Sequence, residues 1–385
     1  MQKTEVYEST SEQIKRLRWE RADDEKGPVL VLFVGIHGNE PAGVRAAEQI
    51  IEKIEKSGTS LFGSVYVMNG NTRALKEGVR FLDTDLNRLW ETFGTSRDYG
   101  RLNGSQKPME YIEGLEIKEA LETIVERHRD KAEKLVFADL HTTSSQSCAF
   151  VLLNDTLANR DLAKKFPVPQ ILGIEENIRG TLLSYINNMG HIAIGFEAGS
   201  HTDAISVERS EAFLWLLMEK LDLIELPDPV IREHEQMIQA HPNIPDTYYE
   251  ILHHKIVDDP EKFIMISGFE NFDQVEKGDA LAYEDGELLR APESGRIFMP
   301  LYQKKGHDGF LIIRPVSPFW LTLSGYLRRS PVHNLLHYLP GVQRVGSNRF
   351  EIDLRVARFL VKEIFHLLGY RVIEKDFDTL ICYRR

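Results

Sequence analysis

The chain has 385 residues, of which 42% are hydrophobic and 28% charged, and its formal net charge is -12. This length and composition are typical of a globular protein with one large core and a smaller domain, or with two domains. The acidic balance, with no basic tract to offset it, argues against a nucleic-acid-binding protein.

The ends of the chain and its cysteines indicate the compartment. Only Cys148 and Cys382 are present, so no disulfide framework is predicted and a reducing compartment is expected. The polar segment 1–27 lacks the apolar region of a signal peptide, and we expect an edge strand around Glu5–Tyr7. No apolar run approaches the ~20 residues of a membrane span. The sequence therefore predicts a cytoplasmic protein, and it leaves open whether the protein is a monomer or a homo-oligomer.

The first apolar run, Val29–Val34, predicts a strand buried on both faces. The turn GIHGNE follows, and a helical pattern begins at Pro41, a residue that the first turn of a helix tolerates. His37 and Glu40 therefore lie at the carboxyl end of a buried strand, where open α/β sheets place their ligand sites. Two metal-ligating side chains in one turn would supply half of a zinc site.

After a second predicted strand, Ser64–Asn69, the segment RFLDTDLNR at 80–88 is rich in charged and amide side chains. A surface loop is the simpler interpretation. However, Asn87 and Arg88 together suit a substrate carboxylate, because a guanidinium makes paired charge-assisted hydrogen bonds and an amide adds a donor. Arg80 would reach a reacting carbonyl. Two further carboxylates would hold these groups in place, namely Asp83 and Asp85.

A helical pattern over Glu113–His128 precedes another buried strand, Lys134–Leu140, which ends at His141. A lone histidine at a strand end is more often structural than a ligand. Here, however, it ends a parallel-type strand as His37 does, and Asp139 could orient neighbouring groups. Two histidines and one carboxylate are the protein ligands of a catalytic zinc that keeps one position open.

The apolar strand His191–Phe196 leads into Glu197. A charge at the start of a helix is the simpler interpretation of this residue. A metal-dependent hydrolase nevertheless needs a general base, and a half-buried glutamate is the usual one, so Glu197 is our candidate. We expect His201 to be a polar loop residue and not a fourth ligand.

The pattern of the sequence changes at Pro227 and Pro229, where an amphipathic helix gives way to short strand-like runs separated by Gly, Asp and Asn. We predict an α/β hydrolase domain over 1–227 and a β-rich domain over 228–315. The latter is similar to the half-barrel of lipoyl and biotinyl carrier domains but lacks their modified lysine, so the likeness concerns architecture alone.

The remaining residues, 316–385, are predicted to be a C-terminal extension packed on the body. The extension begins with PFWLTLSGYL, for which packing on the body is preferred to a membrane-surface role. A helix is expected over Leu354–Leu368, followed by two strand-like runs, YRVIEK and TLICYRR.

Four motifs in this order, GIHGNEPAG, RFLDTDLNR, ADLHTTSS and IGFEAG, make the chain similar to the succinylglutamate desuccinylase and aspartoacylase family over about residues 29–315. That family is a branch of the zinc carboxypeptidase fold. The resemblance implies an α/β fold, with a mixed, mainly parallel sheet flanked by helices and a smaller β-rich domain that caps the active site.

The resemblance also implies roles for individual residues. Zinc, one ion per chain, would be bound by His37, Glu40 and His141. Glu197 would be the general base and Arg80 would polarise the scissile carbonyl. The remaining groups would contact the substrate or lie near it: Asn87 and Arg88 on a carboxylate, with Tyr302 and Lys305 of the cap nearby. Some relatives carry an arginine where this chain has Asn187 and Asn188, so the resemblance does not extend to a narrow N-acetylaspartate specificity.

We therefore predict a zinc-dependent hydrolase that cleaves the amide bond of an N-acyl amino acid or a similar small carboxylate. Alternatives are a metallocarboxypeptidase on short peptides and an esterase or deacylase on another acylated metabolite. A binding protein that has kept the fold without activity is disfavoured, because every expected catalytic residue type is present. Cobalt or manganese could take the place of zinc in such a ligand set.

Overall fold

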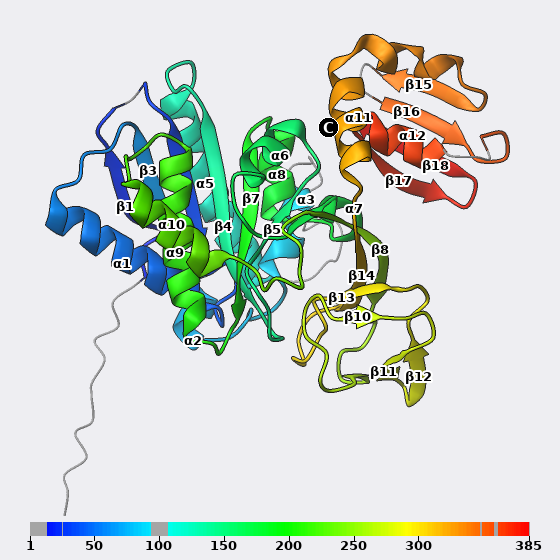
Figure 1. Cartoon of the computed structure of the whole chain (residues 1–385), viewed down its shortest axis with the longest axis horizontal. Coiled ribbons are helices and arrows are strands. Elements are labelled where there is room, and N and C mark those ends of the chain that lie inside the picture. The colour runs from blue at the N-terminus through cyan, green and yellow to red at the C-terminus, as the bar shows by residue number, and fades with distance from the viewer. Residues whose placement is uncertain (1–13, 25, 94–106, 347–348, 358–360, 385) are drawn as a thin grey trace, which may run out of the picture.

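The structure is a computed structural model that describes residues 14–24, 26–93, 107–346, 349–357 and 361–384 (Figure 1). The edge strand expected around Glu5–Tyr7 lies outside these residues. The chain forms an α/β body from β1 to α10 (Leu17–Ile238), a β-rich cap from β8 to β14 (Tyr248–Pro315) and a C-terminal module from α11 to β18 (Pro318–Arg384) (Figure 1).

The body and the cap share one sheet, which is mixed and has a mainly parallel centre. Strands β3, β2, β4 and β7 are parallel to one another, and so are β5, β6 and β8. The β5–β7 pair is antiparallel. The described strands follow the order β1 (Leu17–Ala22), β3 (Ser64–Asn69), β2 (Val29–Val34), β4 (Leu135–Thr143), β7 (Ile192–Ser200), β5 (Phe150–Leu153), β6 (Gln170–Leu172), β8 (Tyr248–Ile256), β14 (Asp308–Pro315), β13 (Gly295–Phe298) and β10 (Gln274–Val275).

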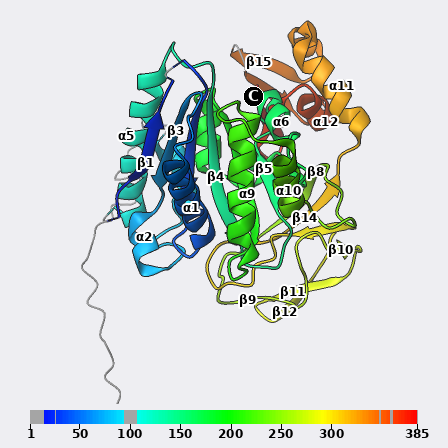
Figure 2. The ribbon, with the colours of Figure 1, turned by 60° about the vertical axis from the view of Figure 1, so that its left-hand side comes forward.

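Helices cover both faces of the central strands. On one face lie α1 (Pro41–Ser57), α9 (Ile205–Lys220) and α10 (Asp228–Ile238), which stand in front of the sheet in Figure 2. On the other face lie α5 (Met109–His128), α8 (Leu182–Asn188) and the short α3 (Trp90–Phe93). Alternate residues of β2 enter the two cores, so Leu30 and Leu32 pack on one side and Val29 and Val31 on the other. The predicted strand, buried on both faces, is confirmed.

Local signals explain the first helix. Pro41 occupies its first turn, and Gly58 ends it in the left-handed conformation with a φ of 65°. Its buried residues recur at helical spacing and face the sheet, including Ala46, Ala47, Ile50 and Ile54. The short elements that complete the body are α2 (Thr72–Glu77), the 3-10 turn η1 (Leu86–Arg88), α6 (Leu157–Ala163) and α7 (Ile174–Asn177).

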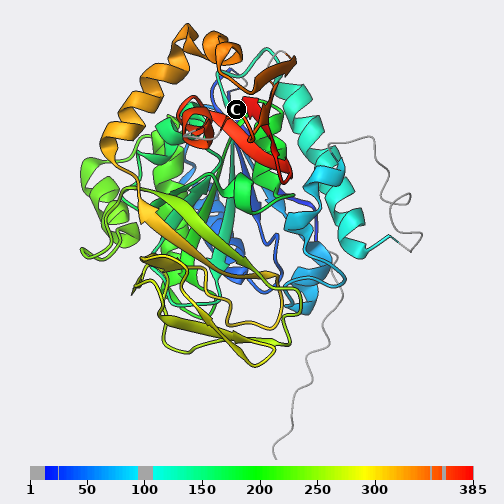
Figure 3. The same ribbon diagram turned by 90° about the vertical axis from the view of Figure 1, so that its right-hand side faces the viewer.

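The cap continues the sheet of the body, because β8 pairs with β6 of the body on one side and with β14 on the other. It adds a small sheet of β12 (Glu287–Arg290), β11 (Ala280–Glu284) and β9 (Phe263–Met265), seen at the bottom of Figure 3. Helix α10 packs on the body through Ile231 and Ile238, although the sequence assigns it to the β-rich part. The boundary at 227/228 stays a prediction.

The C-terminal module has its own sheet and its own core. The sheet runs β15 (Val342–Gly346), β16 (Arg349–Asp353), β18 (Thr379–Arg384) and β17 (Tyr370–Asp376). With it lie α11 (Pro318–Arg329), the 3-10 helix η2 (Pro331–Tyr338) and α12 (Val361–Leu367). Leu321 of α11 packs on the body core, and Arg328 Nη2 lies 2.6 Å from Asp155 Oδ2 of the body.

The helix expected over Leu354–Leu368 is wrong at its start. Residues 354–356 form a turn after β16, and the helix is described only from Val361, while 358–360 lie outside the described residues. The side chain of Asp353 accepts a hydrogen bond from the backbone N–H of Arg355 at 2.9 Å, which favours a turn over a helix. The strands predicted at YRVIEK and TLICYRR are confirmed.

None of the described helices is long and apolar enough to cross a membrane.

The body core predicts a sharp cost for one aromatic truncation. Phe213 is fully buried, and its ring stacks on that of Phe196 with 4.0 Å between centroids. Phe213→Ala should lower the free energy of unfolding by about 3–5 kcal/mol, measured by urea denaturation. The control Phe62→Ala, at a side chain that is 54% exposed, should change it by less than about 0.5 kcal/mol. Equal effects would contradict this assignment of the core.

Candidate metal centre

The turn between β2 and α1 is compact and places two candidate ligands. The backbone N–H of Glu40 donates to the carbonyl of His37 at 3.2 Å, which closes the turn. A side chain at Gly38 would meet the backbone of Ala74 at 2.1 Å, so only glycine fits there. Both His37 and Glu40 are buried.

His141 on β4 completes a cluster with these two residues. The carboxylate of Glu40 lies between two imidazoles, with Oε1 at 2.8 Å from His37 Nδ1 and Oε2 at 3.0 Å from His141 Nδ1. One ligand atom from each of the three residues lies within 4.8 Å of the others. These residues could hold a metal ion through two ring nitrogens and one carboxylate oxygen.

The other nitrogen of each ring faces a second carboxylate. His37 Nε2 lies 3.2 Å from Asp85 Oδ1, and His141 Nε2 lies 2.7 Å from Asp139 Oδ2. A proton on each Nε2 is then shared with a carboxylate, which leaves the Nδ1 lone pairs for an ion. This is how metal-binding histidines are usually oriented in proteins.

Charge pairing keeps the carboxylate of Glu40 ionised. Burial raises the pKa of Glu40, but the adjacent His37 and His141 outweigh that effect and hold the pKa well below its usual range. Burial lowers the pKa of His141, but Asp139 and Glu40 hold it well above the usual range, so a metal ion that binds at Nδ1 must displace a proton from this ring. Glu40 is therefore a carboxylate at neutral pH, as a metal ligand must be.

Arg80 lies beside the cluster and is fixed by two acids. Its Nη2 lies 2.9 Å from Asp85 Oδ2, and its Nη1 lies 3.4 Å from Glu40 Oε1. Asp85 thus contacts both His37 and Arg80. Asp83, expected to hold Asn87 and Arg88, instead accepts a hydrogen bond from the backbone of Met109 at the start of α5.

Asn87 and Arg88 are brought together on η1, as the sequence predicts. Asn87 Oδ1 accepts the backbone N–H of Leu182 at 2.8 Å, so its Nδ2 is the atom that can donate to a ligand. Arg88 Nη2 forms an ion pair with Asp308, the first residue of β14 in the cap. Sequence reasoning missed Asp308, because no local pattern marks it.

Glu197 on β7 lies directly opposite His141 in the parallel register of β4 and β7. It is buried, and its Oε2 has no hydrogen-bond partner among the residues that the structure describes. Burial raises the pKa of Glu197 to about 8. His201 stands outside the cluster of three, with Nδ1 at 2.7 Å from Thr142 Oγ1.

Of the two cap residues expected near the site, Lys305 contacts the segment 80–88, whereas Tyr302 forms hydrogen bonds within the cap. Lys305 Nζ donates to the carbonyl of Phe81 at 3.2 Å and so touches the segment 80–88. The hydroxyl of Tyr302 accepts the backbone N–H of Phe269 at 3.0 Å and donates to the carbonyl of Ile266, so it joins two parts of the cap. In the body, Asn187 donates to the carbonyl of His191 at 2.8 Å, a contact that holds the end of α8.

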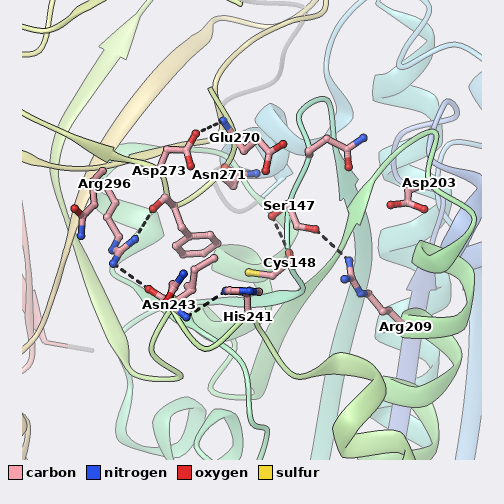
Figure 4. Close-up of a pocket in the computed structure, with 14 residues that line it drawn as sticks. Ser147, Cys148, Asp203, Arg209, His241, Asn243, Glu270, Asn271, Asp273 and Arg296 are labelled. Atoms are coloured by element: carbon pink, nitrogen blue, oxygen red, sulfur yellow. Dashed lines mark hydrogen bonds between the residues drawn. The ribbon is translucent and has the colours of Figure 1, made fainter. Parts of the chain in front are cut away.

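A separate cavity of about 850 Å³ lies between the body and the cap, and none of the residues that line it belongs to the His37, Glu40 and His141 cluster (Figure 4). Arg209 and Arg296 lie on opposite sides of it and donate to the backbone carbonyls of Ser147 and Phe272, at 3.1 and 2.6 Å. Asn271 forms part of its wall and donates to Ser145 Oγ at 3.0 Å.

The contacts of Asp85 predict a measurable effect on metal binding. Asp85→Asn should weaken the affinity for zinc about 10- to 100-fold, because it removes the charge that orients His37. Competition with a chromophoric chelator measures that affinity. Asp83→Asn, two residues away and bonded to α5 instead, is the matched control and should leave the affinity unchanged. An equal loss in both variants would remove Asp85 from the support of the site.

Residues 26–214 match the family model of the succinylglutamate desuccinylase/aspartoacylase catalytic domain. A succinylglutamate desuccinylase from Ectopseudomonas mendocina is 24% identical over 323 residues, which cover 77% of this chain and 89% of the relative. One from Pseudomonas paraeruginosa is 35% identical over 66 residues, 17% of this chain and 20% of the relative.

Solved structures share the fold. A succinylglutamate desuccinylase/aspartoacylase from Rhodobacter sphaeroides has a TM-score of 0.55 and 14% identity, covering 76% of this chain and 87% of its own. A succinylglutamate desuccinylase from Vibrio parahaemolyticus has a TM-score of 0.53 and 18% identity, covering 76% and 83%. Residues 26–214 therefore form a catalytic domain of the succinylglutamate desuccinylase/aspartoacylase family.

Proposed function

We propose that this protein is a zinc-dependent deacylase that hydrolyses the amide bond of an N-acyl amino acid or a similar small carboxylate. The observation that carries the proposal is that one ligand atom from each of His37, Glu40 and His141 lies within 4.8 Å of the others, with both Nδ1 atoms beside the Glu40 carboxylate. Membership of a family named for two deacylases supports amide hydrolysis as the reaction.

The donor set suits zinc. Two imidazole nitrogens and one carboxylate oxygen are a common catalytic zinc set, and the acids on both Nε2 atoms are the partners that such histidines require. His37, Glu40 and His141 would hold one ion per chain. A bound zinc ion supplies Lewis-acid chemistry, because it acidifies water and draws electron density from a carbonyl oxygen.

Glu197 is the proposed general base. It would take a proton from the attacking water and return it to the departing amine, so that the amide gives a carboxylate and an amine. Its burial, and a pKa raised to about 8, suit a group that must accept and release a proton near neutral pH.

Arg80, Asn87 and Arg88 are the proposed substrate contacts. The guanidinium of Arg80, held by Asp85 and Glu40, would polarise the scissile carbonyl and stabilise the oxyanion that forms there. Arg88 and Asn87 Nδ2 would hold the substrate carboxylate and fix the amide relative to Glu197. The cap touches this segment through Lys305 and Asp308, which favours a small substrate over a peptide.

The first test combines metal analysis with a hydrolysis assay. The purified protein should contain about one zinc ion per chain and release amino acids from a panel of N-acetyl and N-succinyl amino acids, and a chelator should abolish that release. Added zinc should restore it. Chelator-insensitive release would contradict the zinc mechanism, and bound metal without turnover on any member of the panel would contradict the substrate class.

Two substitutions separate metal binding from proton transfer. Glu197→Gln should keep about one zinc ion per chain and lower kcat at least a hundredfold, because the base is lost while the ligands stay. His141→Ala should lose the metal and the activity together. Elemental analysis and initial rates distinguish the two variants. Near-normal turnover in the first, or a full complement of zinc in the second, would remove that residue from its role.

A further inference from the structure

Arg88 already forms an ion pair with a carboxylate of the protein itself. Asp308 Oδ2 pairs with Arg88 Nη2, and Asp308 Oδ1 lies 2.9 Å from His254 Nε2 on β8. Arg88 and Asp308 are 220 residues apart in the chain. This ion pair therefore joins the proposed substrate subsite of the body to the cap.

The pair lies in a partly enclosed place. The side chains of Arg88 and Asp308 are 31% and 24% exposed, and that of His254 is 8% exposed. Three residues before Asp308, Lys305 contacts the carbonyl of Phe81. The cap residues 305–308 thus meet the segment 80–88 at both of its ends, and Asp308 faces the one guanidinium that would bind the substrate carboxylate.

Asp308 is ionised throughout the physiological range. Burial raises its pKa, but the hydrogen bond to His254 and the charge of Arg88 outweigh that effect and hold the pKa well below its usual range. Two carboxylates cannot share one guanidinium without mutual repulsion. A substrate carboxylate must therefore displace Asp308 from Arg88 or bind beside it at a cost.

Neighbouring groups allow Arg88 to exchange Asp308 for a substrate carboxylate, but they do not offer a second binding site for that carboxylate. Arg80 is already paired with Asp85 and Glu40, so it offers no uncompensated charge. His254 can keep a hydrogen bond to Asp308 when Arg88 turns to a ligand, so the displaced carboxylate need not remain unpaired.

We propose that Asp308 is a specificity-determining residue that competes with the substrate carboxylate for Arg88. This inference rests on the proposed function. The wild-type protein would therefore prefer carboxylates over uncharged analogues less strongly than it would if Asp308 did not compete for Arg88. Substrates with a second anchoring group would be affected least.

Matched probes test the competition. N-acetyl-L-alanine and its carboxamide, N-acetyl-L-alaninamide, differ only in the charged group. Asp308→Asn should lower KM for the acid about five- to tenfold, while kcat for the acid stays within about twofold and KM for the amide does not change. Asp308→Glu keeps the competing charge and should retain the wild-type ratio of the two KM values.

Glu284→Gln is the matched control. It removes another cap ion pair, Lys255 with Glu284, whose side chains are 24% and 23% exposed, and it should leave both KM values unchanged. If Asp308→Asn does not fold, Asp308→Ser removes the same charge and carries the same expectation. An equal shift for acid and amide, an unchanged KM for the acid, or a higher KM for the acid would overturn the proposal.

Binding separates this inference from the proposed function. Calorimetric titration of zinc-loaded Glu197→Gln with the two probes measures affinity without turnover. In the double variant Glu197→Gln/Asp308→Asn, the affinity for the acid should rise about five- to tenfold, and the affinity for the amide should stay unchanged. If the wild type hydrolyses neither probe nor the wider panel but this shift is found, the deacylase proposal fails and the competition stands. If hydrolysis is found without the shift, the competition fails and the deacylase stands.

Discussion

The carboxylate of Glu40 is the group on which the candidate site depends. It is almost fully buried, and an isolated charge there would cost several kcal/mol, so the fold must surround it with partners. His37 comes from its own turn, whereas His141 and the backbone N–H of Thr142, at 3.1 Å, come from β4. These partners converge because β2 and β4 are parallel and in register, with Val34 opposite Leu140. The same register places Glu197 of β7 opposite His141. The register of the parallel strands therefore also fixes the geometry of the site.

This constraint explains why so much of the site is readable in the sequence. Each of the proposed ligands follows a short apolar run, and the carboxyl ends of parallel strands meet at one edge of a sheet. Strand β2 and helix α1 are specified by signals within a few residues of each other, namely a run of apolar residues, a compact turn and Pro41. The order of the motifs indicates the family, and the family in turn predicts the α/β fold that the structure confirms.

Contacts between distant segments are what the sequence does not reveal. Asp308 meets Arg88 across 220 residues, and nothing in the sequence around it distinguishes it from other surface acids of the cap. The cap also continues the body sheet through the pairing of β8 with β6, an arrangement that a change in composition cannot disclose. The helix expected from Leu354 fails for a related reason. Its apolar spacing fits a helix, but β16 pairs with β18 as far as Asp353, whose side chain then begins a turn.

The electrostatics of the site follow from local pairs and not from the net charge of -12. Arg80 is held by Asp85 and Glu40, and Arg88 is held by Asp308, so both guanidiniums near the candidate metal centre are already compensated by acids. Such pairing fixes the orientation of each guanidinium, but it also lowers its attraction for an incoming anion. The two acids of Arg80 belong to the body, whereas the acid of Arg88 belongs to the cap. Under the roles proposed for these two residues, the cap would set the selectivity for substrate charge, and the body would set the activation of the carbonyl.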